Sequence, residues 1–198
     1  MPRKAQPPTQ PSALERLSTN ESASLWSQML KRHPELRAEA EVLALEMITK
    51  VNSEGVAEDV VFALEDIQQE DIWGRSGSDQ YGGYVDPGEA AYELCEEALD
   101  PFLEELKRLL TMGLEAPALA QVQGMLLGLH ALEGKLLADA EEYPGDGGIY
   151  GVLGTWVEAS PAASDRALLA WVDQELPDWA EDVRHTLSSK RKPTRKAR

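Results

Sequence analysis

Cysteine is nearly absent from this chain, in which Cys95 is the single thiol among 198 residues. One cysteine excludes an intrachain disulfide framework and any zinc site built from several cysteines. A chain without disulfides suits a reducing compartment, so we expect a cytoplasmic protein.

Long apolar runs are absent as well. The first residues, Met1 to Pro8, carry positive charge with no apolar stretch behind it, so we expect no secretory signal. The most apolar window, 119–137, still contains His130, Glu133 and Lys135, which makes it too polar to cross a membrane. We expect a core helix there and no membrane association.

Negative charge is missing from both ends of the chain. All 35 acidic residues lie between Glu15 and Asp182, and residues 11–189 hold 11 of the 19 lysines and arginines, a formal charge of −24. Residues 1–11 contain four prolines and few apolar side chains, so burial cannot offset the entropy of ordering them. The sequence therefore predicts a disordered arm over 1–11, a single helical domain over 12–189 and a basic disordered tail over 190–198.

Period-two alternation is also absent, and nearly every apolar run has the 3.6-residue period of a helix. The pattern predicts an all-α fold without a sheet, with about eight helices in antiparallel hairpins, either as a helical bundle or as a short repeat-like array. The helices expected from apolar stripes and turn residues cover 20–32, 34–51, 53–67, 86–110, 116–140, 149–159, 164–176 and 177–189.

Three of these helices carry specific expectations. The helix over 34–51 is expected to bury one face, made of Leu36, Ala40, Leu43, Ala44, Met47, Ile48 and Val51. Asp86 followed by Pro87, with Glu89 three residues after the cap, predicts the start of the next long helix, which we expect to continue through Pro101, with a kink or a fresh cap there. The helix over 116–140 has a stripe of small residues, Ala120, Gly124, Gly128 and Ala131.

Each glycine in that stripe costs about 1 kcal/mol of helix propensity relative to alanine. Close approach of another helix backbone would offset this cost. We expect the neighbour to be the helix over 86–110.

The segment Tyr84 to Leu94, continued by Ala98 to Arg108, resembles uncharacterised bacterial helical proteins. Some of these are similar to the helical region that accompanies SWIM-type zinc fingers. The cysteines and histidine of the finger have no counterpart here, so the resemblance implies a helical scaffold without zinc and without the finger's nucleic-acid role.

Catalytic signatures are missing. Neither G-x-S-x-G nor H-E-x-x-H occurs, and the glycine cluster over 145–154 lacks both a preceding strand and a Walker lysine, so we interpret it as a turn and a helix start. Cys95 falls on an inner stripe among acidic neighbours, where burial and negative charge both oppose a thiolate. We expect a core residue and no nucleophile.

One acidic cluster leaves a metal-dependent enzyme as an alternative. His130 precedes Glu133 by three residues, and Glu93 and Glu97 lie on the preceding long helix. Dimetal helical bundles use Glu followed three residues later by His, and they use it twice, whereas here the order is reversed and occurs once. We expect no metal and no cofactor.

The glycine-rich segment 74–85 is the expected partner-binding site. Together with the residue before it, it supplies Trp73, Arg75, Tyr81 and Tyr84, and aromatic residues combined with arginine are typical of recognition surfaces. A packed connection that covers the core is the alternative interpretation.

The basic tail is the second candidate site. Its six cations are Lys190, Arg191, Lys192, Arg195, Lys196 and Arg198. They favour contact with nucleic-acid phosphates, but the tail has no aromatic side chain on which bases could stack. We therefore expect a non-catalytic protein-interaction or scaffold module with an unknown protein partner; a nucleic-acid-associated protein that uses the tail is the first alternative, and the metal-dependent enzyme is the second.

Overall fold

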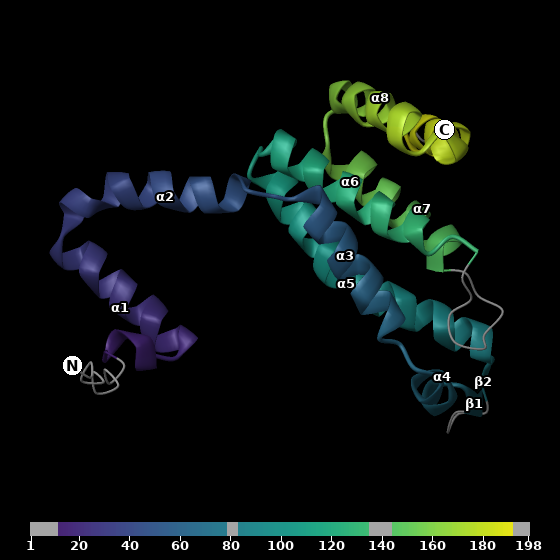
Figure 1. Cartoon of the computed structure of the whole chain (residues 1–198), viewed down its shortest axis with the longest axis horizontal. Coiled ribbons are helices and arrows are strands. Elements are labelled where there is room, and N and C mark those ends of the chain that lie inside the picture. Colours follow the sequence, from purple (N-terminus) through teal and green to yellow (C-terminus); the bar gives the residue numbers. More distant parts are fainter. Residues whose placement is uncertain (1–11, 79–82, 135–143, 192–198) are drawn as a thin grey trace, which may run out of the picture. The chain divides into compact units, whose positions relative to one another are not determined.

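The computed structural model of the chain describes residues 12–78, 83–134 and 144–191, so the arm predicted over 1–11 lies outside the described residues. Within these ranges it contains nine α-helices, four short 3₁₀ helices and one two-stranded sheet (Figure 1). The predicted all-α class is confirmed. The prediction that no sheet forms is wrong, because the strands β1 (Gly77–Ser78) and β2 (Tyr84–Val85) pair antiparallel and are too short to show an alternating pattern in the sequence.

The chain divides into two compact units, one up to Ile48 and one from Thr49 onward, whereas the sequence predicts one helical domain over 12–189. We call the first the N-terminal unit and the second the helical body. No helix in the described parts of either unit has the length and apolar character needed to span a membrane.

The N-terminal unit contains two helices joined by a tight turn. Its elements are η1 (Leu14–Arg16), α1 (Thr19–Arg32), η2 (Pro34–Leu36) and α2 (Arg37–Thr49). A capping box starts α1, because the Glu21 backbone N–H donates to Ser18 Oγ while the Ser18 backbone N–H donates to the Glu21 carboxylate at 2.9 Å. His33 and Pro34 end α1 as predicted.

The apolar face predicted for the helix over 34–51 is not buried. Among residues 12–48 every residue keeps some solvent exposure, and Leu43 and Met47 of α2 are 50% and 77% exposed. The prediction that α2 packs inward is therefore wrong. The physical reason is that α2 has apolar side chains on more than one side, as Val42 and Leu45 show, so no single face is the obvious one to bury.

The helical body is built on four long helices. In chain order its helices are α3 (Ser53–Glu65), α4 (Gln69–Arg75), α5 (Pro87–Thr111), α6 (Glu115–Ala131), α7 (Pro144–Ala159), η3 (Ala162–Ser164), α8 (Asp165–Glu175), η4 (Pro177–Trp179) and α9 (Ala180–Lys190). Helix α6 packs against α3, α5 and α7, and successive long helices run antiparallel (Figure 1). Helices α8 and α9 pack on each other at one end of this bundle, and α4 packs on α5 at the other.

The ends of the long helices follow local signals only in part. Helix α5 starts as predicted, with Asp86 accepting from the Glu89 backbone N–H at 3.0 Å, and it continues through Pro101. Helix α6 stops at Ala131 instead of continuing to residue 140, and Gly134 has a φ of 70°. Only a residue without a Cβ adopts that left-handed conformation readily, so Gly134 suits the turn that follows α6; residues 135–140 of the predicted helix lie outside the described residues.

The core of the body surrounds α6. Val122, Met125, Leu126 and Leu129 are fully buried there, and the buried Gln121 side chain donates to the Phe102 carbonyl at 3.4 Å. A helix that packs against neighbours on several sides is apolar around most of its circumference, which is what α6 shows.

The glycines of α6 lie against the backbone of α3. A Cβ on Gly124 would stand 2.5 Å from the Ser53 carbonyl oxygen, and a Cβ on Gly128 would stand 2.8 Å from that of Ala57. Close approach of a second helix is confirmed, but the expected neighbour, α5, is wrong. The glycines admit the Val56 and Val60 side chains of α3 at the same four-residue spacing, whereas the buried face of α5 is rich in leucine.

Candidate functional site

The structure describes part of the predicted loop site. Trp73 and Arg75 belong to α4 and Tyr84 belongs to β2, while Tyr81 lies outside the described residues. Trp73 and Tyr84 are 62% and 67% exposed. The structure thus leaves two of the predicted aromatic side chains accessible to a partner.

Arg75 is engaged within the body. Its Nη2 donates to Glu97 Oε2 at 2.9 Å, and its Nη1 lies 3.6 Å from Glu93 Oε2, so the guanidinium joins α4 to α5. The hydrogen bond to Glu97 raises the pKa of Arg75 above its ordinary value. The side chain therefore fixes the position of α4, which is the role of a packed connection.

Arg75→Ala is expected to loosen α4 without unfolding the body. Amide hydrogen exchange in 69–78 should become about threefold faster, because the partly exposed ion pairs contribute modestly to the local opening equilibrium. Trp73→Ala, which removes an exposed side chain from the same helix, is the matched control. Unchanged exchange in Arg75→Ala would show that the ion pairs do not hold α4.

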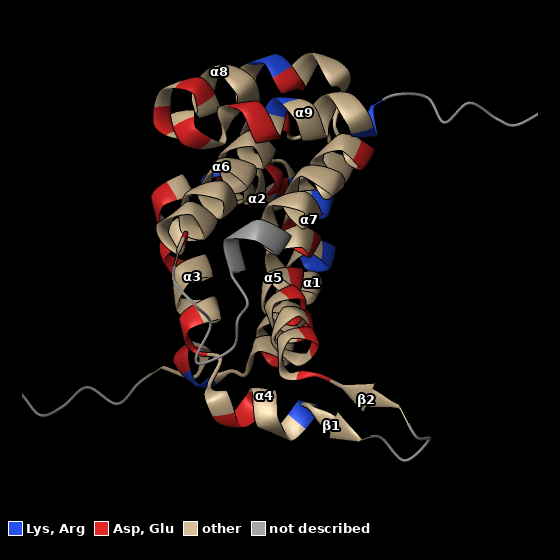
Figure 2. Ribbon diagram, turned by 90° about the vertical axis from the view of Figure 1, so that its right-hand side faces the viewer, with Lys and Arg blue, Asp and Glu red and all other residues tan. Residues whose placement is uncertain are grey.

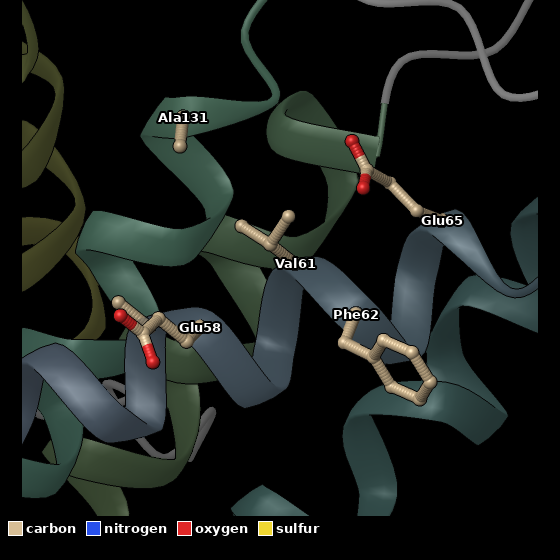
Figure 3. A pocket seen from close by; sticks show the side chains of 6 residues that line it. Glu58, Val61, Phe62, Glu65 and Ala131 are labelled. Carbon is tan, nitrogen blue, oxygen red and sulfur yellow. The ribbon is translucent and has the colours of Figure 1, made fainter.

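A groove lies along α3. It has a volume of about 330 Å³ and is lined by Ala57, Glu58, Val61, Phe62 and Glu65 of α3 and by Ala131 at the end of α6 (Figure 3). All six residues belong to the helical body. The small side chains Ala57 and Ala131 keep the groove open where two larger ones would fill it.

The groove follows from how α3 packs on α6. Val60 and Leu64 are fully buried, so the neighbouring positions Val61 and Phe62 come to the edge of that contact. Figure 3 shows Val61 pointing toward Ala131, and Glu58 and Glu65 at the two ends of the row. Phe62 is 72% exposed, the largest exposed fraction among the aromatic residues of the described chain.

Sequence reasoning misses Phe62, because the apolar stripe of this helix runs through 56, 60, 61, 64 and 67. The signal that could have found it is its position. Phe62 is a large aromatic residue on the face that Asp59 and Asp66 mark as solvent-facing. A phenylalanine on an acidic helix face does not belong to the core stripe, so together with neighbouring exposed apolar surface it is a candidate contact for a partner.

The groove is surrounded by negative charge. Residues 53–65 contain four acidic side chains and no lysine or arginine. Residues 1–48 contain six cations and six acids, so the whole formal charge of −16 belongs to residues 49–198. Figure 2 shows acidic residues along α3, α5, α8 and α9. A ligand of the groove therefore meets an anionic field.

The residues of the alternative metal site are not brought together. Among the described residues no group of three or more histidine, cysteine or carboxylate side chains is arranged to hold a metal ion. Glu93 and Glu97 face Arg75, whereas His130 Nε2 lies 3.4 Å from Glu133 and the His130 ring meets Trp179 edge-on, with 5.1 Å between ring centroids. Helix packing explains both the contacts of Arg75 with the two carboxylates and the contacts of His130.

The predicted boundary of the basic tail is wrong by two residues. Lys190 is the last residue of α9, and its Nζ donates to the Tyr150 carbonyl at 3.0 Å. Arg191, which follows it, is also part of the folded body. The remaining predicted tail cations, Lys192, Arg195, Lys196 and Arg198, lie outside the described residues.

Arg191 makes a dense set of contacts. Its guanidinium donates to both carboxylate oxygens of Asp165, each at 2.7 Å, and to the carbonyls of Ser160 and Val157 at 2.9 and 3.1 Å. Asp165 also accepts from Trp156 Nε1 at 2.9 Å. The hydrogen bonds to Asp165 raise the pKa of Arg191 above its ordinary value. This network ties the end of α9 to the junction of α7 and α8.

A second hollow, of about 340 Å³, lies where α6 meets α7 and α8. The Glu115 carboxylate on its rim accepts a hydrogen bond from Ser164 Oγ at 2.9 Å, and its one aromatic side chain, Trp156, is fully buried. Unlike the groove along α3, this hollow therefore offers a partner no exposed aromatic side chain.

Comparison of the chain with protein-family models, with curated proteins and with solved structures finds no match. The resemblance of 84–108 to bacterial helical proteins stays a prediction. Of the geometric features, the groove along α3 combines an exposed aromatic residue, an apolar floor and a uniform charge.

Proposed function

We propose that the chain is a non-catalytic protein-interaction module, and that the groove along α3 receives a cationic amphipathic helix of a partner protein. The observation that carries the proposal is Phe62, which stands 72% exposed beside an apolar floor with Glu58 and Glu65 at the two ends. Helices that dock in grooves present apolar anchors at three- and four-residue spacing, and the row along α3 has that spacing.

Burial of Phe62 supplies the affinity. Covering a phenylalanine side chain that is exposed in the free protein contributes about 1.5–3 kcal/mol. Aromatic anchors in the centre of an interface are the residues whose loss costs most binding energy. Phe62 is therefore the expected anchor.

The acidic surroundings supply the selectivity. Lysines or arginines on the partner helix, one turn from its apolar anchors, would meet Glu58 and Glu65, whereas an acidic partner would be repelled by the charge of the body. The same field disfavours nucleic acid, and Lys190 and Arg191, two of the six cations expected to bind phosphate, are engaged within the body.

The test is a titration of the full chain with a labelled synthetic amphipathic helix of leucine and lysine, followed by fluorescence anisotropy. Phe62→Ala is expected to weaken binding at least about tenfold. The fold should be unaffected, because the side chain is mostly exposed. Exchanging Glu58 and Glu65 for glutamine should lower the association rate and the salt dependence.

Two controls decide the outcome. The leucine–glutamate counterpart of the peptide is expected not to bind, and Trp73→Ala should bind the cationic peptide like the wild type. Equal affinity of Phe62→Ala and the wild type would refute the groove. A loss in Trp73→Ala alone would move the site to the segment 73–85 that the sequence predicts.

A further inference from the structure

The N-terminal unit exposes a large share of the chain's apolar surface. Of the thirteen large apolar residues that the described chain exposes, seven precede Ile48. They are Leu14, Trp26, Met29, Val42, Leu43, Leu45 and Met47. Apolar surface at this density marks an interface.

Helix α1 carries one apolar stripe. Leu25, Trp26, Met29 and Leu30 follow the spacing of a single helix face, and η2 packs against α1 at its end. None of the four is buried. The stripe has the width of a helix face that packs in a bundle.

Helix α2 carries two apolar faces. At 100° per residue, Ala40, Leu43, Ala44 and Met47 lie on one side and Ala38, Val42 and Leu45 lie on the opposite side. Figure 1 shows α1 and α2 diverging from the turn at Pro34, so the two helices do not cover each other. A helix that is apolar on two sides is buried by neighbours on both.

The charge of the unit indicates what those neighbours are. Residues 1–48 are formally neutral, whereas residues 49–198 carry −16. Two copies of the helical body repel each other, but two copies of the N-terminal unit do not. A strongly charged partner of either sign, by contrast, gains no net attraction here.

The arrangement of charge along α1 complements itself. Glu21 and Arg32 lie on the same flank of the apolar stripe, about three turns apart. When two copies of α1 pair antiparallel about a twofold axis, Glu21 of each copy comes opposite Arg32 of the other. A self-complementary patch of this kind is what a twofold interface requires.

We infer that two copies of this chain associate through their N-terminal units, with the α1 helices antiparallel and the α2 helices packed beside them. The four helices then form a bundle in which each copy covers the apolar faces of the other. The inference rests on the N-terminal unit and does not depend on the groove along α3.

Sedimentation equilibrium of the full chain tests the association. The expected mass is twice 21.8 kDa. Trp26→Glu should return the chain to monomer mass, because it places a charge in the stripe. Trp73→Glu, a matched change at an exposed tryptophan of the helical body, should leave the dimer intact. A wild type of monomer mass at all concentrations, or a dimer that survives Trp26→Glu, would overturn the inference.

The antiparallel order has its own test. Glu21→Arg and Arg32→Glu should each weaken self-association by about tenfold, because each sets like charges opposite one another. Mixing the two variants should restore dimers, since every pair is then of opposite sign. Glu21→Arg also removes the carboxylate that accepts from the Ser18 N–H at the start of α1, so recovery in the mixture is the readout that separates the charge effect from the loss of this cap. Variants that stay monomeric when mixed would overturn the antiparallel arrangement.

Discussion

Gly128→Leu is expected to lower the free energy of unfolding of the helical body by about 3 kcal/mol, the upper end of the usual cost of overpacking. The reason is that the Cβ atom alone would stand 2.8 Å from the Ala57 carbonyl oxygen and equally close to Val60. A backbone atom cannot rotate away as a side chain can, so α3 and α6 must separate. In a domain of this size the melting temperature should fall by roughly 6–12 °C.

Gly151→Ala is the control for this prediction. Gly151 lies in α7, and a Cβ there would meet nothing within 4 Å. The substitution should be neutral or should stabilise the protein by about 0.4–1 kcal/mol, because alanine restricts the unfolded chain. Chemical denaturation of both variants checks the pair. Equal midpoints for Gly128→Leu and the wild type would mean that α3 does not approach α6 this closely.

Arg191→Met is expected to lower the free energy of unfolding by about 1.5–3 kcal/mol, the range for hydrogen bonds that involve charged groups. The change leaves the partly buried Asp165 carboxylate with the Trp156 indole N–H and without its cation. It also removes the donors that satisfy the carbonyls at the end of α7. Asp165→Asn should cost a similar amount, and the double mutant should cost less than the sum, because both changes break one network.

Arg184 provides the comparison for Arg191. It pairs with Asp173 between α9 and α8, but both side chains are about half exposed, so Arg184→Met should leave the denaturation midpoint nearly unchanged. Urea titrations monitored by circular dichroism would measure all four variants. If Arg191→Met lowered the denaturation midpoint no more than Arg184→Met does, the contacts of Arg191 would contribute no more stability than an exposed ion pair.

The start of α5 could be predicted from the sequence because its signals are local. Asp86, Pro87 and Glu89 specify a cap within one turn, and no distant contact competes with them. The small residues of α6 likewise indicate a close helix contact. Which helix makes that contact depends on how two helix surfaces fit together. Val56 and Val60 of α3 lie against Gly124 and Gly128, and the sequence of neither helix alone shows that pairing.

The wrong predictions share one physical cause. The sequence pattern of a helix does not show which part of the chain, if any, packs against that helix. The stripe in 34–51 predicts a buried face, yet Val42 and Leu45 form a second face and neither is covered in the structure. Charge alone assigns Arg191 to the tail, although its role depends on Asp165, 26 residues earlier. Phe62 escapes sequence reasoning because an exposed side chain does not follow the period of the core.

The network around Arg191 determines where the chain can be shortened. Removing 190–198 to delete the basic segment would also remove the guanidinium that holds the end of α9 and the Lys190 ammonium on the Tyr150 carbonyl. A chain that ends at Ser189 would therefore lose positive charge and fold stability together. A truncation after Arg191 removes four cations and leaves the network in place. This truncation therefore separates the effect of the positive charge from the stabilising contacts of Lys190 and Arg191.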